Sequence, residues 1–307
     1  MMRPDNVFAN RRKVTHIIPV EDAYVWIRTF STNAGFRAVT PATQVVSLLG
    51  RSSVSFDAGT PFRNGFAYET AVNSPVVKYV NKPNDWPPAG IEVMVDRLAD
   101  GLASFHDAAR VTGITGVTSS MDTARFLAGQ PNYLCKQSAA SIHTALTRHL
   151  SDIALDKLAA WYDGAPGLVG HGEYSLANVL SFSGRPDEFT VLTDPYLPLV
   201  PEGFDVGWFL GDLFETSMSP VGAFGARAAA SLGRRFMARY EQSRGGAVLD
   251  NGELWRSFVL RLLHHYIEFR AGRPGASDEA YYLDAIRREY ARESGTFSSA
   301  VFACISA

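Results

Sequence analysis

The first eighty residues consist of short apolar stretches separated by polar breaks. These stretches are rich in β-branched and aromatic residues, which favours strands. Glu21 and Asp22 form a turn between the first two of them, and ATQVVSLLG (42–50) reads as a short helix that ends at Gly50. The predicted strands are VTHIIPV (14–20), AYVWIRTF (23–30), VSFDAG (54–59), FAYETAV (66–72) and SPVVKYV (74–80).

The pattern changes after residues 81–90, NKPNDWPPAG, where three prolines and a glycine break any regular element. Beyond this predicted hinge, apolar residues recur every three or four positions, which predicts helices. The sequence therefore predicts an α+β protein with two lobes. Residues 1–83 form a small β-rich N-terminal lobe with a hinge strand, and residues 84–307 form a larger, mainly α-helical C-terminal lobe. The predicted helices cover 91–108, 138–164 (one helix or two), 220–243, 252–271 and 276–292.

Composition narrows the function classes. The 307 residues carry 29 basic and 31 acidic side chains, so no overall positive field attracts nucleic acid. We see no stretch of about 20 apolar residues, and therefore expect no membrane partner. The N-terminus has no apolar segment of signal-peptide length. Cys135 and Cys304 have no metal-site spacing and are expected to be reduced thiols, so we predict a cytoplasmic protein.

The main candidate site lies in residues 169–194. His171, Glu173 and Asn178 lie between two apolar stretches, and Asp194 ends the strand FTVLTDP after a turn. Asn178 and Asp194 offer the hard oxygen atoms that Mg²⁺ prefers, usually together with nucleotide phosphates. Glu173 could orient or deprotonate an acceptor hydroxyl. The alternative is an ordinary polar loop, in which Asp194 only begins a turn.

These residues resemble a known family. HGEYSLAN (171–178) and LTDP (192–195) resemble the catalytic loop HGDxxxxN and the metal-binding aspartate of the aminoglycoside phosphotransferase and choline kinase-like family, distant relatives of protein kinases. The resemblance implies a two-lobed protein kinase-like fold that uses ATP (or GTP) and Mg²⁺. It also implies that Asp205 braces the catalytic loop and that residues 74–83 contact the adenine. LADGLASFHDA (98–108) and FDVGWFLGDLFE (204–215) look like the helices on either side of the loop.

The sequence also departs from the family pattern. Glu173 replaces the family's aspartate and is one methylene longer, which moves the carboxylate by roughly 1 Å. By count along the chain, Arg28 falls near the family's nucleotide-contacting lysine and Gln44 near that lysine's glutamate partner. Arg28 keeps the charge but not the compact geometry of lysine. Lys78 is the rival nucleotide anchor, and no glycine-rich phosphate loop is visible.

We therefore predict an ATP/Mg-dependent phosphotransferase that acts on a hydroxyl group. The acceptor would be a small molecule, such as an antibiotic or a sugar, or a Ser or Thr of a natural-product precursor peptide. Its catalytic residues would be Glu173 and His171, with His171 in a structural role. Asn178 and Asp194 would hold metal and nucleotide, and Arg28 and Lys78 would bind the nucleotide.

Two other functions stay open. One is a degenerate pseudokinase that binds a peptide, a nucleotide or a partner enzyme without phosphoryl transfer. The other uses Glu173 as a base in elimination of phosphate from a phosphorylated residue. Four arginines in the helix at 227–240 form either a solvated face or a docking surface for an acidic substrate or leader peptide. His264 and His265 point about 100° apart on one helix and cannot chelate a metal together.

Overall fold

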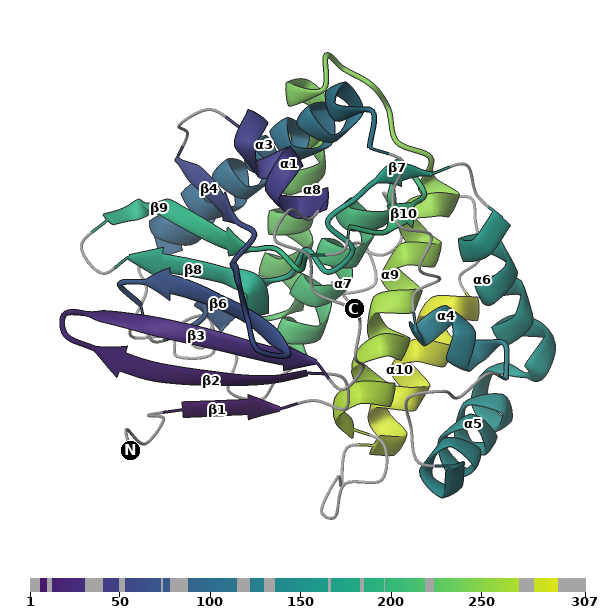
Figure 1. The fold of residues 1–307 in the computed structure, drawn as a ribbon. Helices are drawn as coiled ribbons and strands as arrows, with labels where there is room; N and C mark the ends of the chain where they lie inside the picture. The colour runs from purple at the N-terminus through teal and green to yellow at the C-terminus, as the bar shows by residue number, and fades with distance from the viewer. Residues whose placement is uncertain are drawn as a thin grey trace.

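The structure is a computed structural model, and Lys78, Cys135 and Cys304 lie outside the residues that it describes. The strands of the two larger sheets gather on one side of the molecule, and most helices lie on the other side together with the short pair of strands β7 (Leu168–Val169) and β10 (Leu199–Val200) (Figure 1). The predicted α+β arrangement is therefore confirmed, whereas the lobe boundary at residue 83 stays a prediction. The described residues are 6–9, 13–30, 41–49, 53–72, 74–77, 88–114, 122–129, 136–164, 167–182, 185–195, 197–218, 224–270 and 279–291.

The N-terminal sheet has five antiparallel strands in the order β1-β2-β3-β6-β5. Thr15 of β2 lies opposite Arg28 of β3. Because side chains two residues apart share a face of a strand, Lys13 and Arg28 lie on the same face of this sheet. The strands are β1 (Asn6–Ala9), β2 (Lys13–Val20), β3 (Ala23–Phe30), β6 (Gly65–Thr70) and β5 (Thr60–Phe62).

A second sheet joins the N-terminal part of the chain to the predicted hairpin. β4 (Val54–Asp57) pairs in parallel with β9 (Arg185–Leu192), and β9 pairs with β8 (Val179–Phe182) in antiparallel fashion. The prediction of a strand at 74–80 is wrong for residues 74–77, the part of this stretch that the structure describes. Only a single bridge, from Pro75 to Leu180, and a helical pair at 76–77 are present there. Pro75 has no backbone N–H to donate to a strand ladder.

The helical part begins earlier than the sequence predicted. α3 (Pro88–Thr112) starts inside the expected hinge, because a proline in the first turn of a helix gives up no hydrogen bond. The segment at 138–164 is two helices, separated by Ser151, whose φ is 75°. The helices are α1 (Pro41–Leu48), α4 (Asp122–Leu127), α5 (Lys136–Leu150), α6 (Asp152–Gly164), α7 (Phe204–Ser217), α8 (Ala226–Ser243), α9 (Asn251–His265) with a π-helical turn (Tyr266–Arg270), and α10 (Glu279–Ala291).

The hydrophobic core connects the strands to the helices. A large cluster runs from α1 and β4 through α3 to the C-terminal helices. A Cβ at Gly101 of α3 would lie 2.8 Å from the Val54 side chain, so glycine permits α3 to approach β4 this closely. The smaller cluster includes Trp26 and Tyr68 of the N-terminal sheet and Leu192 of β9. The strand that precedes Asp194 is thus packed against both the sheet and the helices.

Two of the four arginines of α8 pair with the acidic face of α3. Arg235 Nε lies 2.7 Å from Asp96, and Arg239 Nε lies 2.7 Å from Asp100. Hydrogen bonds from Arg239 and Ser243 lower the pKa of Asp100 against the opposing effect of its partial burial. These contacts favour a structural function for this face of α8 over a docking surface for an acidic substrate.

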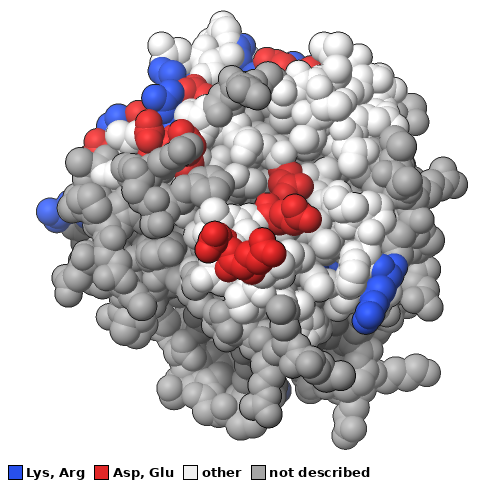
Figure 2. Space-filling model, turned by 60° about the vertical axis from the view of Figure 1, so that its left-hand side comes forward, with Lys and Arg blue, Asp and Glu red and all other residues white. Residues whose placement is uncertain are grey.

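Charges of both signs lie on the surface. On the face in Figure 2, acidic side chains gather near the centre and basic ones near the edges of the view. In the described part of the chain, no helix is both long and apolar enough to cross a lipid bilayer.

Candidate active site

The loop that carries the motif is held by an aspartate at the start of α7. β7 (Leu168–Val169) leads into the loop, and a 3-10 helix (Leu176–Asn178) leads out of it into β8. Asp205 is fully buried and accepts hydrogen bonds from the backbone N–H groups of His171 (2.7 Å) and Gly172 (2.8 Å). Gly172 has a φ of +83°, which favours glycine. Asp205 therefore braces the loop, as the resemblance implied.

His106 of α3 completes this brace. Its Nε2 lies 2.9 Å from Asp205 Oδ2, and its Nδ1 lies 2.7 Å from the Tyr240 hydroxyl. Burial alone would raise the pKa of Asp205. The hydrogen bond and the charge of His106, together with the His171 backbone N–H, outweigh burial and lower it. Asp205 is therefore an ionised carboxylate beside the N-terminus of α7, where the helix dipole favours negative charge.

His171 is a core residue of the loop and does not line the pocket. Its ring is 3% exposed and lies edge-on to Tyr174 and Phe105, with centroids 5.4 and 6.0 Å away. Its Nδ1 accepts a hydrogen bond from the Glu173 backbone N–H at 3.3 Å. Burial lowers the pKa of His171 and outweighs the nearby carboxylates. We conclude that His171 shapes the loop as a neutral imidazole.

The lowered pKa of His171 predicts a pH dependence of stability. The folded protein binds fewer protons at this ring than the unfolded chain, in which histidine has a pKa of about 6.5. The resulting stabilisation is complete above that pH and is lost as the pH falls toward the lowered folded-state pKa. Urea unfolding should be measured between about pH 7.5 and pH 5. As the pH falls over this range, the free energy of unfolding should decrease less in His171→Gln than in the wild type. His16→Gln on β2 is the control, and an unchanged slope in His171→Gln would contradict the prediction.

Asn178 and Asp194 meet at one guanidinium group. Arg28 Nη2 donates to Asn178 Oδ1 at 2.8 Å, and Nη1 lies 3.3 Å from Asp194 Oδ1. The Asn178 amide in turn donates to the Glu173 carbonyl at 2.7 Å. The structure thus brings four of the predicted site residues together: Arg28, Glu173, Asn178 and Asp194. Gln44 lies on the exposed side of α1.

Lys13 was missed by the sequence analysis. Its Nζ lies 2.5 Å from Glu173 Oε2 and 3.2 Å from Asp194 Oδ2, and its side chain is 14% exposed. The sequence held no clear signal for it, because the apolar residues of KVTHIIPV lie on both faces of the strand; the burial pattern of β2 shows its orientation. Thr15 and Ile17 are the buried positions of β2, so Lys13 is in phase with the inward face of that strand. A charged residue in an inward position is a candidate for a function.

The donor atoms suit a magnesium ion that also binds phosphate. Asp194 contributes a carboxylate and Asn178 an amide oxygen, both hard ligands. Within the described residues, no group of three or more His, Cys, Asp or Glu side chains could hold a metal ion. The residues therefore fit a cation that takes its other ligands from a nucleotide and water rather than one held by protein alone.

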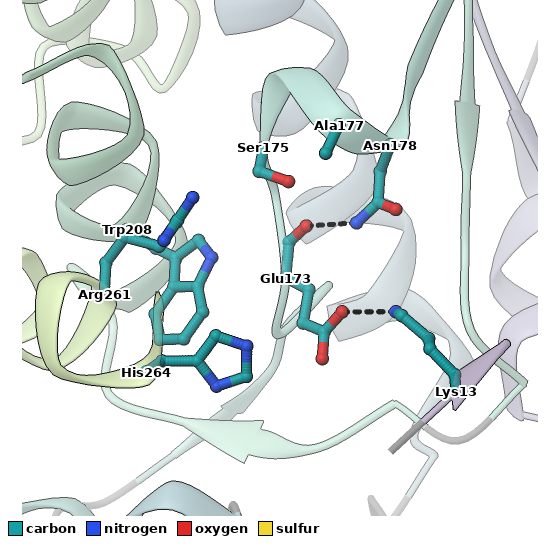
Figure 3. Close-up of a pocket in the computed structure, with 8 residues that line it drawn as sticks. All are labelled: Lys13, Glu173, Ser175, Ala177, Asn178, Trp208, Arg261 and His264. Carbon is teal, nitrogen blue, oxygen red and sulfur yellow. Dashed lines mark hydrogen bonds and ion pairs between the residues drawn. The ribbon is translucent and has the colours of Figure 1, made fainter. Parts of the chain in front are cut away.

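A pocket opens from this cluster toward the C-terminal helices (Figure 3). Glu173 lies between its two sides, with Lys13 and Asn178 on one and Trp208, Arg261 and His264 on the other. Ser175 and Ala177, from the segment that carries the motif, complete the lining. Trp208 comes from α7, and Arg261 and His264 come from α9. Periodicity had assigned Arg261 and His264 to a helix, and the resemblance had implied one at Trp208, but neither gave a sign that these residues face the motif.

A buried ion-pair network fixes this far wall of the pocket. Arg261 pairs with Asp212 of α7, and its Nη1 lies 3.0 Å from Glu215 Oε2. The second carboxylate oxygen of Asp212 accepts the Leu176 backbone N–H at 2.8 Å, so the same network holds the 3-10 helix. His264 Nδ1 lies 2.8 Å from the Thr123 hydroxyl, whereas His265 lies 2.9 Å from Glu215. The two histidines have different partners, as their angular separation predicts.

The fold is similar to that of two solved phosphotransferases. An amicoumacin kinase in complex with AMP-PNP, Ca²⁺ and Ami is 14% identical, with a TM-score of 0.57, and the match covers 94% of this chain and 89% of that one. The GDP and kanamycin complex of APH(2″)-IIIa is 10% identical, with a TM-score of 0.50, and 95% of each chain is covered. Models of protein families and curated protein sequences give no match. At such identities the likeness concerns the fold, and it confirms the kinase-like architecture that the motif indicated.

Proposed function

We propose that this protein transfers the terminal phosphoryl group of ATP or GTP, with Mg²⁺, to a hydroxyl group of a small molecule. The observation that carries the proposal is the convergence of Glu173, Asn178 and Asp194 with the cations of Lys13 and Arg28 beside a pocket. Phosphoryl transfer requires positioning and charge stabilisation more than covalent chemistry. This cluster supplies carboxylates, an amide and cations within a few ångströms of each other.

In the proposed step, the acceptor oxygen attacks the terminal phosphorus, and the bond from that phosphorus to the bridging oxygen breaks. The hydroxyl proton passes to the carboxylate of Glu173, and the nucleoside diphosphate leaves with the bonding electrons. Because the transition state is loose, little base strength is needed, and orientation of the hydroxyl matters more. Glu173 lines the pocket, within reach of a hydroxyl bound there.

Asn178 and Asp194 would hold the magnesium ion, which supplies positive charge to the phosphate oxygens when bound. Arg28 keeps both ligands in place, because its guanidinium is 4% exposed and bonded to each of them. It also lies over the Tyr68 ring, 5.4 Å from the centroid. Arg28 therefore acts as a positioning residue for the metal ligands.

We place the acceptor against Trp208, Arg261 and His264. The indole and imidazole rings line the pocket, with centroids 5.1 Å apart. The charge of Arg261 is balanced by Asp212 and Glu215. Such a wall suits the ring of an antibiotic or a sugar-like molecule. A Ser or Thr of a precursor peptide is the alternative acceptor, and a panel of both kinds of substrate distinguishes the two.

Thermal melting with nucleotide provides the first test. ATP or GTP with Mg²⁺ at 100 times its dissociation constant should add about 2.7 kcal/mol of stability. Asp194→Asn should lose most of this shift, because one metal ligand becomes neutral. Asp187→Asn, at an exposed position of β9, is the matched control and should keep the shift. Absence of a shift with either nucleotide would refute the proposed function.

A degenerate kinase is the second candidate, and one observation favours it. Both oxygens of the Asp194 carboxylate and the Asn178 amide oxygen are already bonded to cationic side chains of the protein. A nucleotide-induced shift without phosphoryl transfer to any acceptor in the panel would support this candidate. Product formation would exclude it.

A further inference from the structure

Lys13 bridges the two acidic groups of the candidate active site. Its ammonium lies 2.5 Å from the carboxylate that would receive the acceptor proton, Glu173, and 3.2 Å from the metal ligand Asp194. Lys13 is the first residue of β2, and in Figure 3 its side chain extends toward Glu173 at the centre of the pocket. All three side chains are 20% exposed or less. The ammonium thus lies where a cation or a phosphate group must enter.

Lys13 and Arg28 differ in their freedom to move. Both lie on the same face of the N-terminal sheet, on neighbouring strands. Arg28 is almost fully buried, bonds two side chains and lies over the Tyr68 ring. The Tyr68 hydroxyl donates in turn to the Thr193 carbonyl at 3.1 Å, which fixes that ring. Lys13 is a compact charge on a flexible four-carbon stem. Of these two cations, Lys13 is the one that can change partners.

Electrostatics indicates when that change occurs. A divalent cation on Asp194 would lie within a few ångströms of the Lys13 ammonium, and repulsion at this distance in a partly buried site is large. A free metal ion must therefore break the ion pairs of Lys13 before it binds, which lowers its affinity. A metal–nucleotide complex brings phosphate oxygens, which give the ammonium new charge-assisted hydrogen bonds. The transfer of Lys13 to phosphate also releases Glu173 toward the acceptor.

We propose that Lys13 is the polyphosphate-binding lysine of this protein, provided by β2. In the nucleotide-free protein it holds Glu173 and Asp194, so that metal and nucleotide bind together and the free metal binds weakly. The inference rests on the proposed function but adds a residue and an order of binding to it. It assigns phosphate binding to Lys13 and leaves to Arg28 the positioning of Asn178 and Asp194.

The test measures two affinities in Lys13→Met. Binding of Mn²⁺ alone is followed by electron paramagnetic resonance, and binding of Mg²⁺ with AMP-PNP by titration calorimetry. We expect Mn²⁺ alone to bind about tenfold tighter or more, because the competing ammonium is gone. We expect the nucleotide complex to bind about 10- to 100-fold more weakly, as for the loss of a hydrogen bond to a charged group. Lys157→Met, at an exposed position of α6, is the control and should change neither.

The opposite signs of these effects separate phosphate binding from a purely structural function. If Lys13 only fastens β2 to the catalytic loop, nucleotide affinity will stay unchanged or both affinities will fall together, and either result overturns the proposal. Lys13→Arg keeps the charge and guards against a folding defect. Lys13→Arg should bind free Mn²⁺ as weakly as the wild type does. If its affinity for free Mn²⁺ rises as much as that of Lys13→Met, the proposal is also overturned. Failure of the wild type to bind any nucleotide would instead reject the proposed function.

Discussion

Glu173→Gln is expected to lower kcat about 10²- to 10⁴-fold, the usual contribution of a positioned general base. The amide keeps the size of the side chain but cannot accept the hydroxyl proton. Nucleotide binding should persist, because Asn178, Asp194 and Arg28 keep their contacts. Single-turnover assays with the best acceptor of the panel give the rate, and melting with nucleotide shows that the site is intact. Glu69→Gln, on the exposed side of β6, should retain full activity.

Glu173→Asp tests whether the longer side chain matters. Shortening it by one methylene withdraws the carboxylate by roughly 1 Å, and a displacement of that size can cost about a hundredfold in rate. We expect such a loss, because the pocket and the contact with Lys13 are built around glutamate. A variant more active than the wild type would mean that the longer side chain of glutamate impairs this site.

Arg261→Met is expected to lower the free energy of unfolding by about 3–5 kcal/mol, because removal of one partner leaves buried charges uncompensated. Asp212 and Glu215 would lose their shared cation, and their side chains are only 5% and 9% exposed. The same substitution would loosen the support of the 3-10 helix, since Asp212 also binds the Leu176 backbone N–H. Urea unfolding at neutral pH measures the change.

Arg235→Met provides the matched control for this prediction. Arg235 also pairs with two acids, Asp96 and Glu92, but its side chain is 43% exposed. Exposed ion pairs contribute between about 0 and 1 kcal/mol. We therefore expect a much smaller loss than for Arg261→Met. Equal losses in the two variants would show that burial does not decide the strength of the Arg261 network.

Local patterns were sufficient for most of the fold. Alternation and β-branched residues predicted β2, β3 and β6, and the three-to-four spacing predicted α3. The prediction failed where a single proline changed the structure that the surrounding residues favour. Pro75 ends strand pairing within a strand-like stretch, while Pro88 begins a helix inside an expected break. The parallel pairing of β4 with β9 was also not predicted, because it joins segments more than 120 residues apart by backbone hydrogen bonds that leave no sequence pattern.

The sequence by itself determined the division into a β-rich part and a helical part and the presence of the motif at 171–178, because strand and helix periodicity and the spacing within that motif are local properties of the chain. Tertiary structure decided what surrounds that motif. Lys13 reaches Glu173 across 160 residues, and Trp208, Arg261 and His264 face it from two helices. Such contacts depend on how strands and helices pack, and packing is set by the summed burial of many side chains. No single stretch of sequence records it.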